Sequence, residues 1–294
     1  MSAIFFERLA IIGFGLIGSS LGRAIKAHGL AGTLVACDAS EAARADILHL
    51  ALADEVTADP VAAVTGADLV IICTPVGSYA ALGATIAPHL KPGAILTDVG
   101  SVKQSVIRDL APLIPPHAHL VPGHPIAGTE KSGPLNGFGE LFLGRWAIIT
   151  PIPDTDRTAI DKVAAFWRAI GSEVVEMDAQ HHDKVLAITS HLPHLIAYTI
   201  VGTAVDLEES LQSEVVKFSA GGFRDFTRIA ASDPIFWRDV FLNNREAVLE
   251  MLQRLTEDLA ALQRAIRWGE GDVLLERFSR AREIRRGVIE AKQA

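Results

Sequence analysis

The most constraining feature of the sequence is an alternation of short apolar runs with helix-like stretches, which extends from Arg8 to roughly Met177. Parallel strands buried on both faces have this pattern, and the stretches between them supply the helices that cover the sheet. The pattern therefore predicts an α/β fold with a doubly wound parallel sheet. The expected strands are Leu9–Ile12, Leu34–Cys37, Leu69–Cys73, Ala94–Thr97, Leu120–Val121, Ala147–Thr150 and Val174–Glu176.

The β-rich runs stop after Asp178, and the rest of the chain has helical spacing. The clearest apolar stripe recurs every three or four residues, at Val248, Met251, Leu255, Leu259, Leu262 and Ile266. We therefore expect an α/β domain over residues 1–178 and an all-helical domain over residues 179–294. The width of the stripe favours a homodimer interface, with an internal core helix as the alternative.

Composition narrows the functional classes. The 294 residues carry 27 basic and 35 acidic side chains, and the formal net charge of -8 argues against a nucleic-acid binder. The mean hydropathy is +0.29, but the most apolar stretch, Leu195–Val205, is shorter than the roughly 20 residues of a membrane span. The amino terminus lacks a cationic signal region, so we expect a cytoplasmic protein that does not insert into membranes. The two cysteines are expected to be buried free thiols.

A glycine fingerprint follows the first expected strand directly. Gly13, Gly15 and Gly18 form Gly-x-Gly-x-x-Gly, and the helix-like run begins at Leu16 and Ile17 within it. In such a loop the first glycine permits a tight turn, the second admits a pyrophosphate, and the third allows close helix packing. The helix amino terminus then faces the phosphate charge. These residues predict a Rossmann-type dinucleotide-binding site.

Asp38 ends the second expected strand, about 20 residues after the fingerprint, where a carboxylate accepts hydrogen bonds from a ribose diol. The same carboxylate repels a 2′-phosphate, and no arginine immediately follows it, so the sequence predicts NAD rather than NADP. A purely structural role for Asp38, as a helix N-cap or a turn residue, is the alternative. Thr74 and Pro75 are candidates for the second wall of the cofactor cleft. An equal alternative is that they form a turn that only ends a strand.

Two polar segments follow later strands and are expected at the carboxyl edge of the sheet, where ligands bind. In Asp98–Lys103, Ser101 is a candidate donor to a ligand, with an N-cap role as the alternative. In Gly123–Glu130, His124 is a candidate general base. We expect His124 in a glycine-bounded loop rather than in the core, with a loop-bracing hydrogen bond as the alternative.

A third group of polar residues is rich in histidine, with His181-His182-Asp183 followed by His191 and His194. Zinc binding is the obvious alternative for such a cluster. We expect no metal, because Pro193 interrupts the cluster, no cysteine is near, and hydride transfer to a nicotinamide needs none. For His181 and His191, burial with a hydrogen bond to a backbone carbonyl competes with a role in a site.

The segment Gly221–Arg228 leads into Ser232–Arg238. Arg228 is the candidate for binding a substrate carboxylate, because the planar guanidinium engages both oxygens. A surface ion pair of Arg228 with Asp225 or Asp233 is the alternative.

Taken together, these motifs resemble the prephenate and arogenate dehydrogenases of tyrosine biosynthesis. The shared segments are the Gly13 fingerprint, Asp-Val-Gly-Ser-Val-Lys, Gly-His-Pro-Ile-Ala-Gly-Thr-Glu, Ser-His-Leu-Pro-His and Gly-Gly-Phe-Arg-Asp-Phe-Thr-Arg-Ile-Ala, in the family's order. The resemblance implies NAD-dependent oxidative decarboxylation of a small molecule, prephenate, arogenate or both, by a homodimer. It implies that His124 is the base, that Ser101 bonds to this histidine and to the substrate hydroxyl, and that Arg228, braced by Asp225, binds the ring carboxylate. It also implies a substrate pocket lined or gated by His182, His191, His194, Glu130 and Trp237.

The sequence departs from the family pattern in two respects, and two other functions are compatible with parts of it. Ser19 and Ser20 follow Gly18 where many relatives have another glycine, and we expect cofactor binding to survive the change. The length leaves no room for a regulatory or chorismate mutase domain, so any tyrosine feedback is expected at the active site. A β-hydroxyacid dehydrogenase with Lys184 as the catalytic lysine, or a non-catalytic NAD sensor, are the alternatives.

Overall fold

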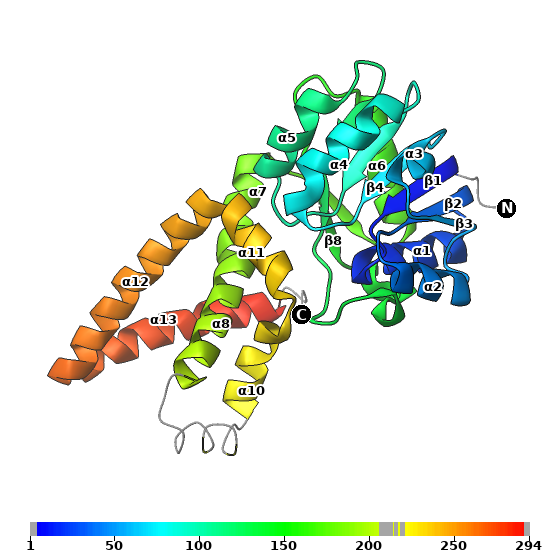
Figure 1. Ribbon diagram of the computed structural model, residues 1–294. Helices are drawn as coiled ribbons and strands as arrows, with labels where there is room; N and C mark the ends of the chain where they lie inside the picture. Colours follow the sequence, from blue (N-terminus) through cyan, green and yellow to red (C-terminus); the bar gives the residue numbers. More distant parts are fainter. Residues whose placement is uncertain (1–4, 206–213, 215–216, 218–220, 291–294) are drawn as a thin grey trace. The chain divides into compact units, whose positions relative to one another are not determined.

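The structure, a computed structural model, describes residues 5–205, 214, 217 and 221–290 (Figure 1). By internal contacts the chain divides into two compact units, Met1–Arg245 and Glu246–Ala294. Residues 179–245 thus share a compact unit with the sheet. The functional boundary expected between residues 178 and 179 stays a prediction.

A six-stranded parallel sheet forms the centre of the first unit, in the order β3-β2-β1-β4-β5-β6. The strands are β1 (Phe6–Ile12), β2 (Ala31–Cys37), β3 (Glu55–Thr57), β4 (Leu69–Ile72), β5 (Ile95–Asp98) and β6 (His119–Val121). Ile12, at the end of β1, pairs with Cys37 of β2 and with Ile72 of β4. The chain therefore leaves β1 in one direction and later continues on its other side, which confirms the predicted doubly wound topology.

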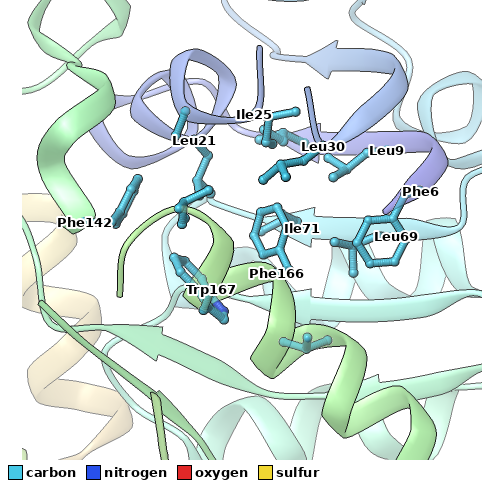
Figure 2. Packing of buried hydrophobic residues seen from close by; sticks show 14 of the residues in the cluster. Phe6, Leu9, Leu21, Ile25, Leu30, Leu69, Ile71, Phe142, Phe166 and Trp167 are labelled. Carbon is cyan, nitrogen blue, oxygen red and sulfur yellow. The ribbon is translucent and has the colours of Figure 1, made fainter. Parts of the chain in front are cut away.

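Helices cover both faces of this sheet, and alternate residues of β1 pack into the cores on its two faces. Leu9 and Ile11 join a core with α1 (Leu16–His28), α2 (Glu41–His49) and α6 (Arg157–Ala169), and Figure 2 shows part of this packing. Ala10 and Ile12 join a second core with α3 (Pro60–Val64), α4 (Tyr79–Ile86) and α5 (Gln104–Leu110). Each fully buried Leu or Ile contributes about 1.5–3 kcal/mol relative to exposure, so these two cores stabilise the sheet that positions the site.

The prediction of one sheet was wrong for its last two strands, which belong to a separate sheet of the order β7-β8-β9. Its strands are β7 (Gly123–Pro125), β8 (Trp146–Ile149) and β9 (Glu173–Glu176). β7 runs antiparallel to β8, with His124 opposite Ile148, and β9 is parallel to β8. β3 and β7 were missed because neither contains two consecutive apolar residues, and β7 also contains glycine and proline.

A long helical segment follows β9 and consists of α7 (Ala179–Leu186), a π-helical part (Ala187–His191) and α8 (Leu192–Val205). Residues Ala179–Ala204 are long and apolar enough to cross a membrane by length and composition, which is weak evidence because core helices pass the same test. This segment also buries His182, Asp183 and His191. π-Helical turns often occur at functional sites. The first unit continues with α10 (Gly221–Thr227), a 3₁₀ turn (Arg228–Ala231) and α11 (Pro234–Asn243).

The second unit holds α12 (Arg245–Trp268), apart from its first residue, and α13 (Gly271–Glu290). An ion pair of 3.2 Å joins Arg277 of α13 to Asp258 of α12. Within the predicted stripe, Val248 is buried, whereas Leu259 and Ile266 are 55% and 66% exposed. Other large apolar side chains of this unit are also exposed in the single chain, namely Leu249, Trp268, Val273, Leu275, Phe278 and Ile284.

Candidate active site

The glycine loop between β1 and α1 has the geometry of a phosphate-binding turn. Gly13 has φ +92°, and a Cβ there would lie 2.9 Å from the Thr74 side chain and from the Cys73 backbone. A Cβ on Gly18 would collide with the carbonyl oxygen of Gly13, whereas one on Gly15 would meet nothing within 4 Å. The loop is thus packed tightly on one side and open at Gly15, where the first turn of α1 carries no acidic residue. These residues fit a dinucleotide.

Asp38 lies beside this loop and accepts hydrogen bonds from the backbone N–H groups of Phe14 (2.8 Å) and Ser40 (2.9 Å). Ser40, not Asp38, is the N-cap of α2, so the N-cap alternative for Asp38 is wrong. Arg44, six residues later, extends back, and its Nη1 donates to the carbonyls of Asp38 and Ala39 at 2.9 Å each. Sequence spacing did not indicate this guanidinium, because a helical turn brings it back to the strand end.

Thr74 and Ser20 support the loop from two sides. Thr74 packs against Gly13, its hydroxyl lies 2.8 Å from that of Ser78, and Pro75 is exposed beside it. Ser20 is fully buried, donates to the Leu16 carbonyl and accepts from the Phe138 N–H at 3.1 Å. The Ser20 hydroxyl therefore fixes the segment after β7 against α1, and a glycine at this position could not make this contact.

His124 lies on the short strand β7 and is only 7% exposed, so the expectation of a loop position outside the core was wrong. A fully buried ion pair holds this strand to the end of β5. Lys103 Nζ lies 2.5 Å from Asp98 Oδ2 and donates to the Gly123 carbonyl, and the Gly123 N–H donates to Asp98 Oδ1 at 3.1 Å. The residue that precedes His124 is thus held through both of its backbone polar groups.

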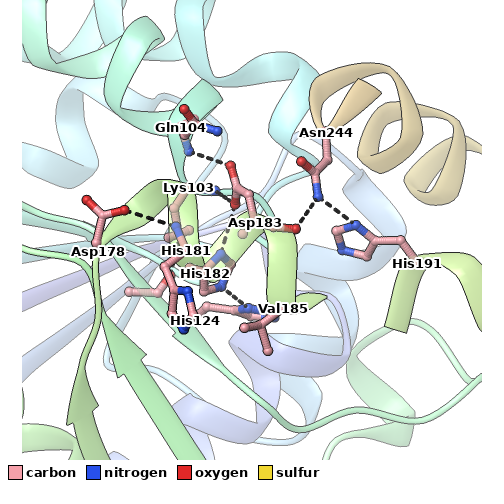
Figure 3. Close-up of polar contacts among 12 residues, drawn as sticks. Lys103, Gln104, His124, Asp178, His181, His182, Asp183, Val185, His191 and Asn244 are labelled. Atoms are coloured by element: carbon pink, nitrogen blue, oxygen red, sulfur yellow. Dashed lines mark hydrogen bonds and ion pairs between the residues drawn. The ribbon is translucent and has the colours of Figure 1, made fainter. Parts of the chain in front are cut away.

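His124 and the two side chains behind it form a hydrogen-bonded chain (Figure 3). His124 Nδ1 lies 2.9 Å from His182 Nε2, and His182 Nδ1 lies 2.8 Å from Asp183 Oδ1. The Asp183 carboxylate also accepts the backbone N–H groups of Lys103 (2.7 Å) and Gln104 (2.9 Å) at the start of α5. Asp183, rather than Ser101, therefore satisfies the first backbone donors of this helix.

The direction of these hydrogen bonds determines which nitrogen of each ring carries a proton. A carboxylate only accepts, so His182 Nδ1 donates to Asp183, and His182 Nε2 of the neutral ring accepts from His124 Nδ1. His124 Nε2 is then left with its lone pair. Burial lowers the pKa of His124 well below its usual value, and the neighbouring His182 and Lys103 lower it further. His124 is thus neutral at pH 7, with Nε2 able to accept a proton.

His191 and His194 follow on the same helical segment. His191 is fully buried, with Nδ1 3.0 Å from Asn244 Nδ2, and burial lowers its pKa to about 4. His194 donates from Nδ1 to the Ser190 carbonyl and stacks on Trp237 with the ring centroids 3.6 Å apart. Burial lowers the pKa of His194, and the positive charge of Arg228 opposes protonation further.

Arg228 forms a different ion pair from the expected one. Its Nη1 lies 2.6 Å from Glu130 Oε2, whereas Asp225 pairs with Arg224 at 3.3 Å. The expected bracing of Arg228 by Asp225 is therefore corrected to Glu130, which sequence spacing could not indicate across 98 positions. The Arg228 side chain is 60% exposed, which leaves most of the guanidinium accessible.

The structure thus connects residues that stand in separate sequence motifs. His182 lies behind His124, and Ser101 is partly exposed. His181 is exposed and only its backbone N–H bonds to Asp178, so the buried alternative for it was wrong. Asp183, Lys103 and Asn244 were missed as site residues, although the first two stand inside quoted motifs. Among the described residues, no group of three or more His, Cys, Asp or Glu is placed to hold a metal ion.

Comparisons with known proteins agree with this geometry. The family models for the nucleotide-binding and dimerization domains of prephenate dehydrogenase match residues 21–176 and 178–280. A cyclohexadienyl dehydrogenase from Zymomonas mobilis is 45% identical over 95% of each chain. The crystal structure of prephenate dehydrogenase from Aquifex aeolicus in complex with hydroxyphenyl propionate and NAD⁺ has a TM-score of 0.89 at 31% identity, covering 96% of this chain and 98% of that one. Synechocystis arogenate dehydrogenase has a TM-score of 0.75 at 25% identity, covering 94% and 99%. The chain belongs to the prephenate dehydrogenase family.

Proposed function

We propose that the protein catalyses the NAD-dependent oxidative decarboxylation of prephenate, arogenate or both, a step of tyrosine biosynthesis. The observation that carries this proposal is the His124–His182–Asp183 chain, which leaves a buried imidazole lone pair at the carboxyl edge of a dinucleotide-binding sheet. Family membership and the NAD⁺ complex of the Aquifex aeolicus relative support the same activity.

In this proposal, His124 Nε2 accepts the proton of the substrate's ring hydroxyl. The glycine loop and Asp38 would hold NAD, which would supply the acceptor for the hydride of the carbon that bears this hydroxyl. The ring carboxylate leaves as carbon dioxide, and its bonding electrons complete the aromatic ring. The proton returns from His124 to the phenolic oxygen, so that the reaction yields the phenol, carbon dioxide and NADH. Aromatisation makes the step favourable, and the side chains contribute mainly orientation and proton transfer.

Asp183 gives the base its direction and stabilises its charged form. When His124 gains a proton at Nε2, the proton on Nδ1 already points to His182, whose own Nδ1 proton points to the Asp183 carboxylate. The negative charge of Asp183 raises the pKa of His182 against the effect of burial. An imidazolium therefore forms next to a fixed carboxylate instead of in an uncharged interior.

For the substrate carboxylate we propose Arg228, with His194 and Trp237 forming the adjacent wall and Ser101 contacting the ring hydroxyl. Arg228 and Glu130 form a partly exposed pair, so a substrate carboxylate can replace Glu130 on the guanidinium. A planar guanidinium binds carboxylate at two points and orients the ring against the cofactor. Because the carboxylate must also depart, Arg228 is expected to matter more for affinity than for turnover.

We also propose that the protein works as a cytoplasmic homodimer. The family model that matches residues 178–280 describes a dimerization domain. The apolar side chains exposed on α12 and α13, among them Phe278 and Leu275, are the surface that a second copy would cover.

Two alternatives are less well supported. A β-hydroxyacid dehydrogenase would need a catalytic lysine, but Lys184 is exposed and stands one position past the buried Asp183. An NAD sensor would need only the glycine loop and Asp38, and would have no use for a buried hydrogen-bonded histidine chain.

The test is NADH formation at 340 nm with prephenate and with arogenate, comparing kcat/KM for the two substrates. Absence of turnover with both would reject the proposal. His124→Asn is expected to lose turnover and to keep substrate affinity, measured by calorimetry with NAD present. Retained turnover in that variant would remove His124 from the role of base.

A further inference from the structure

Asn244, directly after α11, joins the two histidine groups of the site. Its side chain is 3% exposed, and Nδ2 lies 2.8 Å from the Asp183 carbonyl oxygen and 3.0 Å from His191 Nδ1 (Figure 3). Asp183 therefore bonds through its carboxylate to His182 and through its main-chain carbonyl to Asn244. No sequence motif singled out Asn244.

These two contacts fix the orientation of the amide. A main-chain carbonyl can only accept, so the nitrogen of the Asn244 amide, not its oxygen, must face Asp183. One amide proton is used there, and the other points to His191 Nδ1. Because an amide NH₂ group cannot accept, His191 Nδ1 has to be the unprotonated nitrogen, and the neutral ring carries its proton on Nε2.

The Nε2 end of His191 is the unusual part of this arrangement. Nε2 is fully buried, and among the described residues it forms no hydrogen bond of regular geometry. The ring lies edge to face with Trp237, with centroids 6.1 Å apart, and near the main chain of Ser101. Because Nδ1 faces Asn244, the nitrogen that faces the main chain of Ser101 is Nε2, and this backbone contact raises the pKa of His191 against the effect of burial.

We propose that Asn244 is a positioning residue that holds His191 as the neutral Nε2–H tautomer, so that this ring turns its donor toward the main chain of Ser101 and fixes the segment that carries the Ser101 hydroxyl. His191 is then a donor and not a second base, and His124 is the single proton acceptor. The expected effect on substrate binding rests on the proposed function, in which Ser101 contacts the ring hydroxyl of the substrate. The tautomer itself follows from contacts within the protein.

The first test reads the tautomer directly, without substrate. Two-bond proton–nitrogen correlation spectra of the full chain with ¹⁵N-labelled histidine distinguish Nε2–H from Nδ1–H, and His191→Asn assigns the signals. At pH 7 we expect His191 as Nε2–H. Asn244→Asp places an acceptor at Nδ1 and is expected to convert the ring to Nδ1–H. A wild-type His191 that is Nδ1–H, or that is charged at pH 7, would overturn the proposal.

The second test separates positioning from stability. Asn244→Leu keeps the size and removes both donors, and is expected to raise KM for the substrate about 10-fold or more while KM for NAD stays unchanged. Asn243→Leu is the matched control, because the neighbouring Asn243 bonds to the Asp239 carbonyl and not to a histidine. An Asn244→Leu protein that is less stable but keeps both the tautomer and the KM would show a purely structural role. If wild type turns over neither substrate yet His191 is Nε2–H, the proposed function fails while the role of Asn244 in fixing the tautomer stands.

Discussion

Removing the charge of Asp183 is the sharpest test of the histidine chain. Asp183→Asn keeps the shape of the side chain but leaves one acceptor oxygen where the carboxylate has two. In the structure these two oxygens accept from three donors, His182 Nδ1 and the backbone N–H groups of Lys103 and Gln104. In either orientation, an asparagine therefore places its NH₂ against at least one of these donors.

The size of the effect follows from the geometry. A proton taken up by His124 can be shared with His182, whose Nδ1 lies 2.8 Å from Asp183 Oδ1. Unit charges centred about 4 Å apart interact by about 4 kcal/mol at an effective dielectric constant of about 20. That energy corresponds to about 10³-fold in rate. Since part of the charge stays on His124, we expect kcat to fall by about 10²–10³-fold, with a loss of stability of about 1–3 kcal/mol for the unpaired donor.

The assay is NADH formation under saturating substrate and NAD, with urea unfolding of the same preparation to separate rate from stability. Asp178→Asn is the matched control, because Asp178 is the exposed N-cap of the same helix and asparagine caps equally well. A folded Asp183→Asn enzyme that keeps kcat within about threefold of wild type would refute the role of the His124–His182–Asp183 chain, since it would show that the buried charge does not act on the base.

Three further outcomes are expected. Arg228→Ala should raise KM for the substrate more than it lowers kcat, and an unchanged KM would reject the carboxylate assignment. Asp38→Asn should raise kcat/KM with NADP, because Arg44 remains at the strand end to bind a 2′-phosphate. Arg44→Ala in the Asp38→Asn background should reverse this gain. An unchanged kcat/KM with NADP in Asp38→Asn would show that Asp38 does not determine the preference for NAD. The protein should lose stability on acidification, because the pKa of His191 is about 4 in the folded protein and about 6.5 for an ordinary, solvated histidine, so the unfolded chain binds the proton first. Between about pH 6.5 and pH 5 the free energy of unfolding should fall by about 2 kcal/mol because of His191, as measured by urea unfolding. His191→Phe should remove this contribution, and an equal pH dependence of stability in both proteins would contradict the prediction.

The fold was predictable because its signals are local. Strand periodicity and the glycine fingerprint depend on neighbouring residues, and they placed β1 and α1 correctly. The sheet containing His124 was not predictable, because its first strand, Gly-His-Pro, has no apolar pattern and forms only by pairing with β8. The partner of Arg228 was equally out of reach, since Glu130 lies 98 positions away.

By itself, the sequence determined that the chain folds into a dinucleotide-binding sheet followed by helices, and it identified His124 and Arg228 as chemically suitable residues. These conclusions need only the residue types and their spacing. Tertiary structure alone decided what each group can do. The buried ion pair of Asp98 and Lys103 fixes the strand of His124, and Asp183 fixes the direction of its hydrogen bonds. The physical reason is that proton positions and pKa values depend on burial and on hydrogen-bond partners, and folding brings those partners together from distant parts of the chain.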